Sequence, residues 1–216
     1  MCPGPDAEGA PKAAAVALQF HPPTAEEDRA RAGYYALLAR LFYDGPEAAV
    51  LAAIAGADEI VEDHAPEFAR AWNALAAAAE AMDPEAARLE YDQVFLGVGK
   101  AEVTPYASYY LSETGREKIL VRLKQQIAEL GLARAERASE PEDHFAGLFE
   151  VMRHLISDSS DAALQKQKRF FVQFIGPAYS LFCTAISASP KTNFYRPVAE
   201  FARHFLDIES ESLKVF

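Results

Sequence analysis

The chain has 216 residues, half of them hydrophobic and a quarter charged, and its net charge is −11. This composition is typical of a globular protein and excludes an intrinsically disordered chain. The acidic balance leaves no basic stripe to neutralise phosphates, which argues against nucleic acid as a partner. An acidic surface instead speeds the encounter with a basic partner, although in many proteins it serves solubility alone.

The number of cysteines and the hydropathy of the chain exclude further classes of protein. Cys2 and Cys183 are the two cysteines, which excludes a disulfide framework and a cysteine-based metal site. No apolar run reaches the roughly 18–20 residues needed to cross a bilayer. The first residues also lack the basic region that precedes the apolar part of an export signal. We therefore expect a cytoplasmic protein without stable membrane insertion.

Helix-favouring residues dominate the first half of the chain, which is rich in Ala and sparing of Val, Ile and Thr runs. Residues 1–23, rich in Ala, Pro and Gly, are expected to form a mobile extension. The capping box Thr24-Ala25-Glu26-Glu27 then opens a helix that ends at Asp44-Gly45. Three further helices are predicted to begin at prolines, the last of them ending before Gly97 and Gly99: Pro46, Pro66 and Pro84.

The second half is also predicted to be helical. A turn segment over 104–111 precedes a long helix over 113–130, for which Gly131 is the expected C-cap. Helical sequence resumes over 141–156 and over 161–187, the latter interrupted by Gly176-Pro177, and again from Asn193 to the C-terminus. The sequence thus predicts an all-α protein, a single compact domain of about nine or ten helices. Its expected parts are an N-terminal block (24–131), a hinge-like loop (132–140) and a C-terminal block (141–216).

The segment Glu140-Pro141-Glu142-Asp143-His144 places three carboxylates and an imidazole at the start of a predicted helix. Pro141 suits a first helical turn because it has no amide hydrogen to leave unpaired, and acidic residues favour the positive end of the helix dipole. Helix initiation explains these residues but not His144. Beside Asp143, an imidazole can act as acid, base, metal ligand or hydrogen-bonding recognition group.

Catalysis, metal binding and nucleotide binding have weaker support. The sequence contains no nucleophile elbow, and it has no His-x-x-x-His or Cys-x-x-Cys pair of metal ligands. Gly97-Val98-Gly99-Lys100 lacks both the spacing and the preceding strand of a phosphate loop, and is typical of a helix-terminating turn. We therefore predict no enzyme activity, no metal and no cofactor.

An aromatic-rich region lies between the fourth helix and the long helix that follows. Most aromatic residues at helical spacing belong to a core, but tyrosine has an apolar ring and a polar tip, which suits a partly exposed groove for a peptide helix. The region contains Tyr91, Phe95, Tyr106, Tyr109 and Tyr110.

Four segments together resemble, in order and spacing, the signatures of the TorD/DmsD family, cytoplasmic chaperones that mature molybdenum-containing oxidoreductases. The first is Glu140–His144, which matches Glu-Pro-x-Asp-His. The second, Tyr91–Gly99, matches an aromatic, Leu-Phe and Gly-Pro-Gly-like pattern, with Val94 and Val98 in place of the usual Leu and Pro. The others are Pro105–Tyr110 and Asn193–Arg196. The resemblance covers the chain from about Thr24 onward.

The resemblance implies a chaperone that binds the twin-arginine signal peptide and the body of a molybdopterin-dependent oxidoreductase precursor. It would assist cofactor insertion and proofread the precursor before export. An acidic rim suits the basic region of such a peptide, and an aromatic groove suits its apolar stretch. The expected signal-peptide and partner-binding residues are Glu140, Glu142, Asp143, His144, Tyr91, Phe95, Ser108 and Tyr109.

The sequence also leaves two alternative functions open. One is a nucleotide- or small-molecule-binding helical regulatory protein, since weak guanine-nucleotide binding has been proposed for some family members. Another is a small all-α enzyme that uses His144 with Glu142 or Asp143. A homodimer formed by exchange of the C-terminal block across the 132–140 loop is a further expectation to test. Burial of Asp143 and His144 with no accessible cleft nearby would argue against the peptide site.

Overall fold

The computed structural model describes residues 25–61, 65–97, 101–133, 140–158 and 162–215. Over these ranges the chain forms ten α-helices and two π-helical segments, so the all-α prediction is confirmed. The expected 1–23 extension, the capping residue Thr24 and most of the 132–140 loop lie outside the described residues. The elements are α1 (Glu26–Tyr43), α2 (Ala48–Ala55), α3 (Pro66–Ala81), α4 (Pro84–Tyr91), η1 (Asp92–Leu96), α5 (Ala107–Leu111), α6 (Arg116–Glu129), α7 (Phe145–Ser157), α8 (Ala163–Phe170), η2 (Phe171–Ile175), α9 (Tyr179–Ala188) and α10 (Tyr195–Val215).

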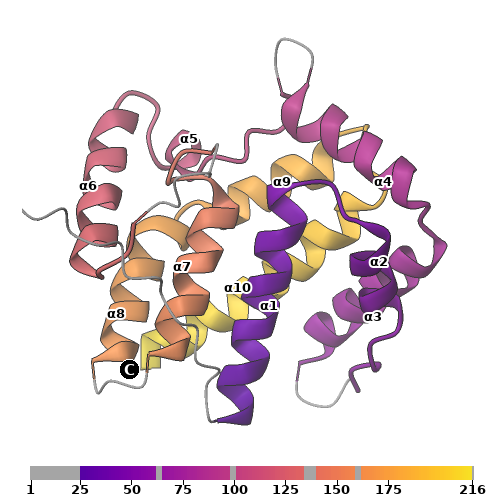
Figure 1. The fold of residues 1–216 in the computed structure, drawn as a ribbon, viewed down its shortest axis with the longest axis horizontal. Coiled ribbons are helices and arrows are strands. Elements are labelled where there is room, and N and C mark those ends of the chain that lie inside the picture. Colours follow the sequence, from indigo (N-terminus) through magenta and orange to yellow (C-terminus); the bar gives the residue numbers. More distant parts are fainter. Residues whose placement is uncertain (1–24, 62–64, 98–100, 134–139, 159–161, 216) are drawn as a thin grey trace, which may run out of the picture.

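Helices from both halves of the sequence share one core. Figure 1 shows α1 and α7 in the middle, with α9 and α10 behind them, α6 and α8 on one side and α2 to α4 on the other. The most extensive packing joins α1 to α7, and α10 packs on both α3 and α9. Fully buried rings from four of these segments form the centre of the core: Phe42, Phe145, Phe149, Phe182 and Tyr195. Buried apolar area of this kind supplies most of the stability of the fold.

Local chemistry sets several helix ends where the sequence predicts them. The Asp83 carboxylate accepts a 2.9 Å hydrogen bond from the Ala86 amide and caps α4, and Pro84 occupies its first turn. Gly131, with φ of 73°, ends α6. The Leu132 amide donates to the Ile127 carbonyl at 3.0 Å, which completes a Schellman motif.

Three local predictions are wrong. Helix α7 begins at Phe145, not at Pro141, because residues 143–145 pair with another segment instead of coiling into a first turn. The 104–111 turn segment contains the helix α5. The second helix, predicted to begin at Pro46, begins at Ala48 after the N-cap residue Glu47, whose backbone is extended. The fourth helix ends before Gly97 as predicted, and its last turn takes the π form over η1, where the Gly97 amide donates a 2.8 Å hydrogen bond to the Asp92 carbonyl.

A buried carboxylate of α4 holds the start of α10. Glu90 accepts hydrogen bonds of 2.8–3.0 Å from three successive backbone amides, those of Asn193, Phe194 and Tyr195. These amides lie at a helix N-terminus, where helical backbone bonds are lacking and negative charge is favoured.

A second buried carboxylate ties α10 to α1. Glu209 accepts bonds from Nε and Nη2 of Arg31 at 2.7 and 2.9 Å, and from the hydroxyl of Tyr35 at 3.0 Å. Arg31 also donates to Gln167 of α8 and pairs with Asp28. Burial lowers the pKa of Arg31, but the hydrogen bonds and charge of Glu209 outweigh it and raise that pKa above its ordinary value.

The length and hydropathy of the described helices can be compared with those of a membrane-spanning helix. No single helix there is long and apolar enough to cross a bilayer, and one bent pair, Ala163–Ile175 with Tyr179–Ala188, passes by length and composition only.

Candidate functional site

Two short segments, residues 105–107 and 143–145, pair their backbones in antiparallel fashion, and we call this pairing the clasp. The Ala107 amide donates to the Asp143 carbonyl at 2.8 Å, and the Phe145 amide donates to the Pro105 carbonyl at 2.9 Å. The clasp fixes the start of α5 against the start of α7. The family-like segment Glu140–His144 therefore has a structural partner 38 positions earlier in the chain, in Tyr106.

His144 is the N-cap of α7 and lies inside the clasp. Its Nδ1 accepts a 3.2 Å hydrogen bond from the Ala146 amide, and its ring meets that of Tyr106 edge-on, with centroids 5.4 Å apart. Burial lowers the pKa of His144 below its ordinary value, against the opposing charges of Glu140 and Asp143. His144 and Asp143 are each 3% exposed, so neither reaches a partner directly in this conformation.

Replacing His144 with Asn is expected to destabilise the protein by about 1 kcal/mol at pH 7.5, because the Tyr106 contact is lost while the amide oxygen still caps α7. The unfolded imidazole takes up its proton before the folded one as the pH falls below about 6.5, so wild-type stability decreases there. Asn does not titrate. Urea unfolding should show a smaller gap between the two proteins at pH 5 than at pH 7.5; an equal gap would contradict the role of this imidazole.

The carboxylates of Glu140 and Glu142 lie beside the clasp, and we call them its acidic edge. The Tyr106 hydroxyl donates to Glu140 at 2.7 Å; burial and this carboxylate raise the pKa of Tyr106 to about 12. Glu142 lies 3.6 Å from the ammonium of Lys124 on α6. Burial, with the charges of Asp44, Glu140 and Asp92, also raises the pKa of Tyr91. Carboxylates from three separate segments therefore converge near Tyr91 and Tyr106.

The expected aromatic groove around Tyr91 and Phe95 is wrong. Both side chains are only 3% exposed, because they pack against Tyr195 of α10 in the core. The Tyr91 hydroxyl lies 2.8 Å from the carbonyl oxygen of Tyr43 and so ties α4 to the end of α1. Ser108 is buried as well. Of the eight predicted residues, only Glu140, Glu142 and Tyr109 are partly or largely exposed.

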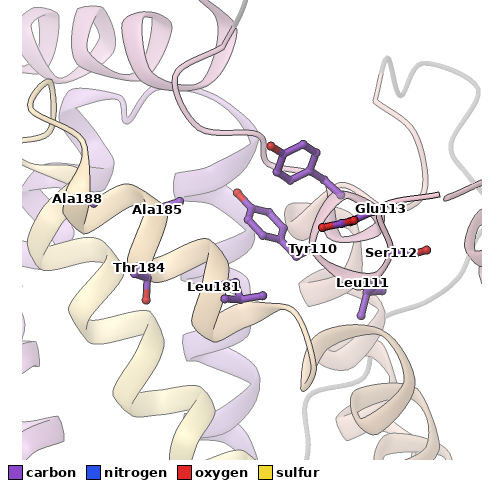
Figure 2. Close-up of a pocket in the computed structure, with 9 residues that line it drawn as sticks. Tyr110, Leu111, Ser112, Glu113, Leu181, Thr184, Ala185 and Ala188 are labelled. Atoms are coloured by element: carbon purple, nitrogen blue, oxygen red, sulfur yellow. The ribbon is translucent and has the colours of Figure 1, made fainter. Parts of the chain in front are cut away.

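An open groove lies instead between α5 and α9, beside the clasp (Figure 2). Its volume is about 590 Å³, and Tyr109 is the one predicted site residue that lines it. Sequence reasoning missed the groove because α5 was expected as a turn; the signal available was an apolar Leu181 that faces away from its helix's buried side. The lining residues are Tyr109, Tyr110, Leu111, Ser112, Glu113, Leu181, Thr184, Ala185 and Ala188.

The clasp supports this groove directly. Phe145, which ends the clasp, stacks on Phe182 of α9 with centroids 4.2 Å apart and ring planes within 12°. Tyr110 of α5 packs edge-on against the same Phe182 at 5.9 Å, and its hydroxyl donates to the Thr104 carbonyl at 2.9 Å. The clasp residues Asp143 and His144 therefore hold the start of α5, the helix that forms one wall of the groove.

The described residues give little support to the alternatives of catalysis, metal binding and nucleotide binding at this site. None of Glu142, Asp143 and His144 lines the groove. Within the described ranges, no group of three or more His, Cys, Asp or Glu side chains is arranged to hold a metal ion. Burial raises the pKa of the Cys183 thiol to about 12, which keeps it protonated at neutral pH. The Gly97–Lys100 segment lies mostly outside the described residues.

The chain is similar to a protein family and to individual known proteins, and these similarities agree with one another. A family model described as the nitrate reductase delta subunit matches residues 62–184, which include the clasp. Two curated proteins named Chaperone protein TorD, from Actinobacillus pleuropneumoniae serotype 3 (strain JL03) and serotype 7 (strain AP76), are each 31% identical over 121 residues. The alignment covers 54% of this chain and 58% of each relative, so the chain matches under two thirds of their length.

A solved structure shares the fold. It is described as a putative redox enzyme maturation protein from Archaeoglobus fulgidus, with a TM-score of 0.52 over 90% of this chain and 98% of the other. At 18% identity, this likeness shows a common architecture only.

Proposed function

We propose, because this chain belongs to the TorD/DmsD family of molybdoenzyme maturation chaperones, that it binds the twin-arginine signal peptide and the body of one molybdopterin-dependent oxidoreductase. Proteins of the TorD family are chaperones and not enzymes. In this proposal the protein holds its client in the cytoplasm while the cofactor is inserted, and delays export until then. The observation that carries the proposal is the family match over residues 62–184, which spans the clasp and α5.

The predicted site residues divide into two groups in this proposal. Glu140 and Glu142 contact the basic region of the signal peptide, since both carboxylates lie on the accessible edge of the clasp. Tyr109, exposed on α5, contacts its apolar part. The buried members position these contacts and do not touch the peptide: Tyr91, Phe95, Ser108, Asp143 and His144.

Changing Glu140 and Glu142 together to Gln is expected to weaken signal-peptide binding about tenfold. Each ion pair at a protein surface contributes up to about 1 kcal/mol, and 1.4 kcal/mol corresponds to a factor of ten in affinity. Gln retains an oxygen that can accept the bond from Tyr106, so the fold is preserved. Isothermal titration calorimetry with a synthetic twin-arginine peptide measures the change, which should shrink at high salt.

The matched control is the double variant Glu67→Gln and Glu211→Gln. It removes the same charge from two exposed, ion-paired carboxylates, on α3 and α10, that belong to neither the clasp nor its acidic edge. Its affinity should stay within about twofold of wild type, because salt screens exposed charges over about 8–10 Å. Equal weakening in both doubles would mean that net charge alone, and not the acidic edge, attracts the peptide.

A further inference from the structure

The groove between α5 and α9 exposes apolar side chains that a folded chain ordinarily buries. Leu181 is 55% exposed and Tyr109 is 46% exposed, and Leu111 lies across from Leu181 in Figure 2. Within the described part of the chain, Glu113 is the one charged residue of the nine that line it. A concave, mainly apolar surface with few polar groups is typical of a binding site.

The α9 side of the groove has the spacing of a helix-docking face. Leu181, Thr184, Ala185 and Ala188 occur at i, i+3, i+4 and i+7, which places them on one stripe of the helix. Seven residues rise about 10 Å, or two turns. The three smaller residues allow another helix to approach closely, while Leu181 offers one large contact at the end of the stripe.

The walls of the groove are already in place. Tyr110 is fixed by its bond to the Thr104 carbonyl and by its contact with Phe182, and Phe182 in turn stacks on Phe145. A preformed groove loses little conformational entropy on binding, so a larger share of the energy of its apolar contacts appears as affinity.

The groove and the acidic edge lie within one turn of α5. Tyr106, which precedes the helix, donates to Glu140, while Tyr109 and Tyr110, three and four residues later, line the groove. One turn of helix corresponds to about 5 Å. A single short peptide with a basic start followed by an apolar stretch therefore matches both surfaces at once, in charge and in hydropathy.

We propose that this groove binds the apolar stretch of the signal peptide as about two turns of helix, with the preceding arginines directed to Glu140 and Glu142. The inference rests on the proposed function and adds the surface that takes the apolar stretch. Glu113 lines the groove just beyond the C-terminal end of α5. Arg116 does not line the groove, and its guanidinium lies 4.6 Å from the centre of the Tyr109 ring. The one charge among the lining residues is therefore negative.

The test uses the full chain and a fluorescein-labelled synthetic peptide of two arginines followed by twelve apolar residues, measured by fluorescence anisotropy. Leu181→Glu is expected to weaken binding at least tenfold, because it places a charge on the apolar wall. Leu89→Glu is the matched control, since Leu89 is 54% exposed on α4 and lines no part of the groove. It should bind within twofold of wild type. Ala188→Trp, which fills the groove without a charge, should also weaken binding.

The outcomes separate the inference from the proposed function. Wild-type affinity in both Leu181→Glu and Ala188→Trp would overturn the groove assignment and leave the chaperone function standing. Failure of the wild-type chain to bind the peptide at all would refute signal-peptide recognition itself. A changed mass by light scattering with unchanged peptide affinity would assign the groove to a second copy of the chain and also overturn the inference. Circular dichroism establishes that each variant is folded.

Discussion

Replacing Glu209 with Ala is expected to lower the free energy of unfolding by about 3–5 kcal/mol, because it leaves the guanidinium of Arg31 largely buried without its main partner. Glu209 binds that guanidinium through both carboxylate oxygens and also accepts from Tyr35. The side chain of Glu209 is 2% exposed and that of Arg31 is 17% exposed, so water replaces little of what is lost. Urea unfolding followed by circular dichroism measures the change.

A double variant distinguishes a buried charge from a lost contact. Arg31→Met combined with Glu209→Leu removes both charges and should recover part of the lost stability, since well-packed apolar residues often replace a buried ion pair at little cost, although the Tyr35 hydroxyl still lacks its acceptor. Glu211→Ala, on the same helix but exposed and paired with Lys214, should change stability by less than about 0.5 kcal/mol. If the double variant is no more stable than Glu209→Ala, the penalty lies in packing or in the unpaired Tyr35 hydroxyl, and not in the unpaired charge of Arg31.

Replacing Glu90 with Ala is expected to cost about 3 kcal/mol, because three amides at the start of α10 lose their acceptor together. Each buried donor left unsatisfied costs about 1–3 kcal/mol, and two of the three bonds are buried. Glu90→Gln keeps one acceptor oxygen and should fall between wild type and Ala. Thermal and urea unfolding report both changes.

The control for Glu90 is Glu80→Ala, an exposed residue near the end of α3. It should change the free energy of unfolding by no more than about 0.5 kcal/mol, as surface substitutions ordinarily do. Hydrogen exchange adds a local readout, since the amides of Phe194 and Tyr195 should exchange faster in Glu90→Ala than in wild type. Unchanged protection of these amides would show that another group caps α10.

The segment Glu140–His144 shows which features follow from the residues and which depend on the fold. Glu140 to His144 is recognisable from its sequence, and the family it indicates is confirmed by the match over residues 62–184. The role of its members is not recognisable from the sequence. A predicted first helical turn was consistent with Pro141, Glu142 and Asp143, yet the backbone there pairs with Tyr106 and delays α7 to Phe145. Pairing between distant segments leaves no local signal.

The sequence by itself determined the all-α class, most of the helices and the family. Asp83, Pro84 and Gly131 act through hydrogen bonds and backbone angles within a few residues, so their effects can be predicted without a fold. Tertiary structure alone decided which aromatic rings are core and which face the solvent, because burial depends on neighbours far along the chain. Tyr91 is covered by α10, whereas Tyr109 stays exposed on a groove whose two walls, α5 and α9, meet only when the chain folds.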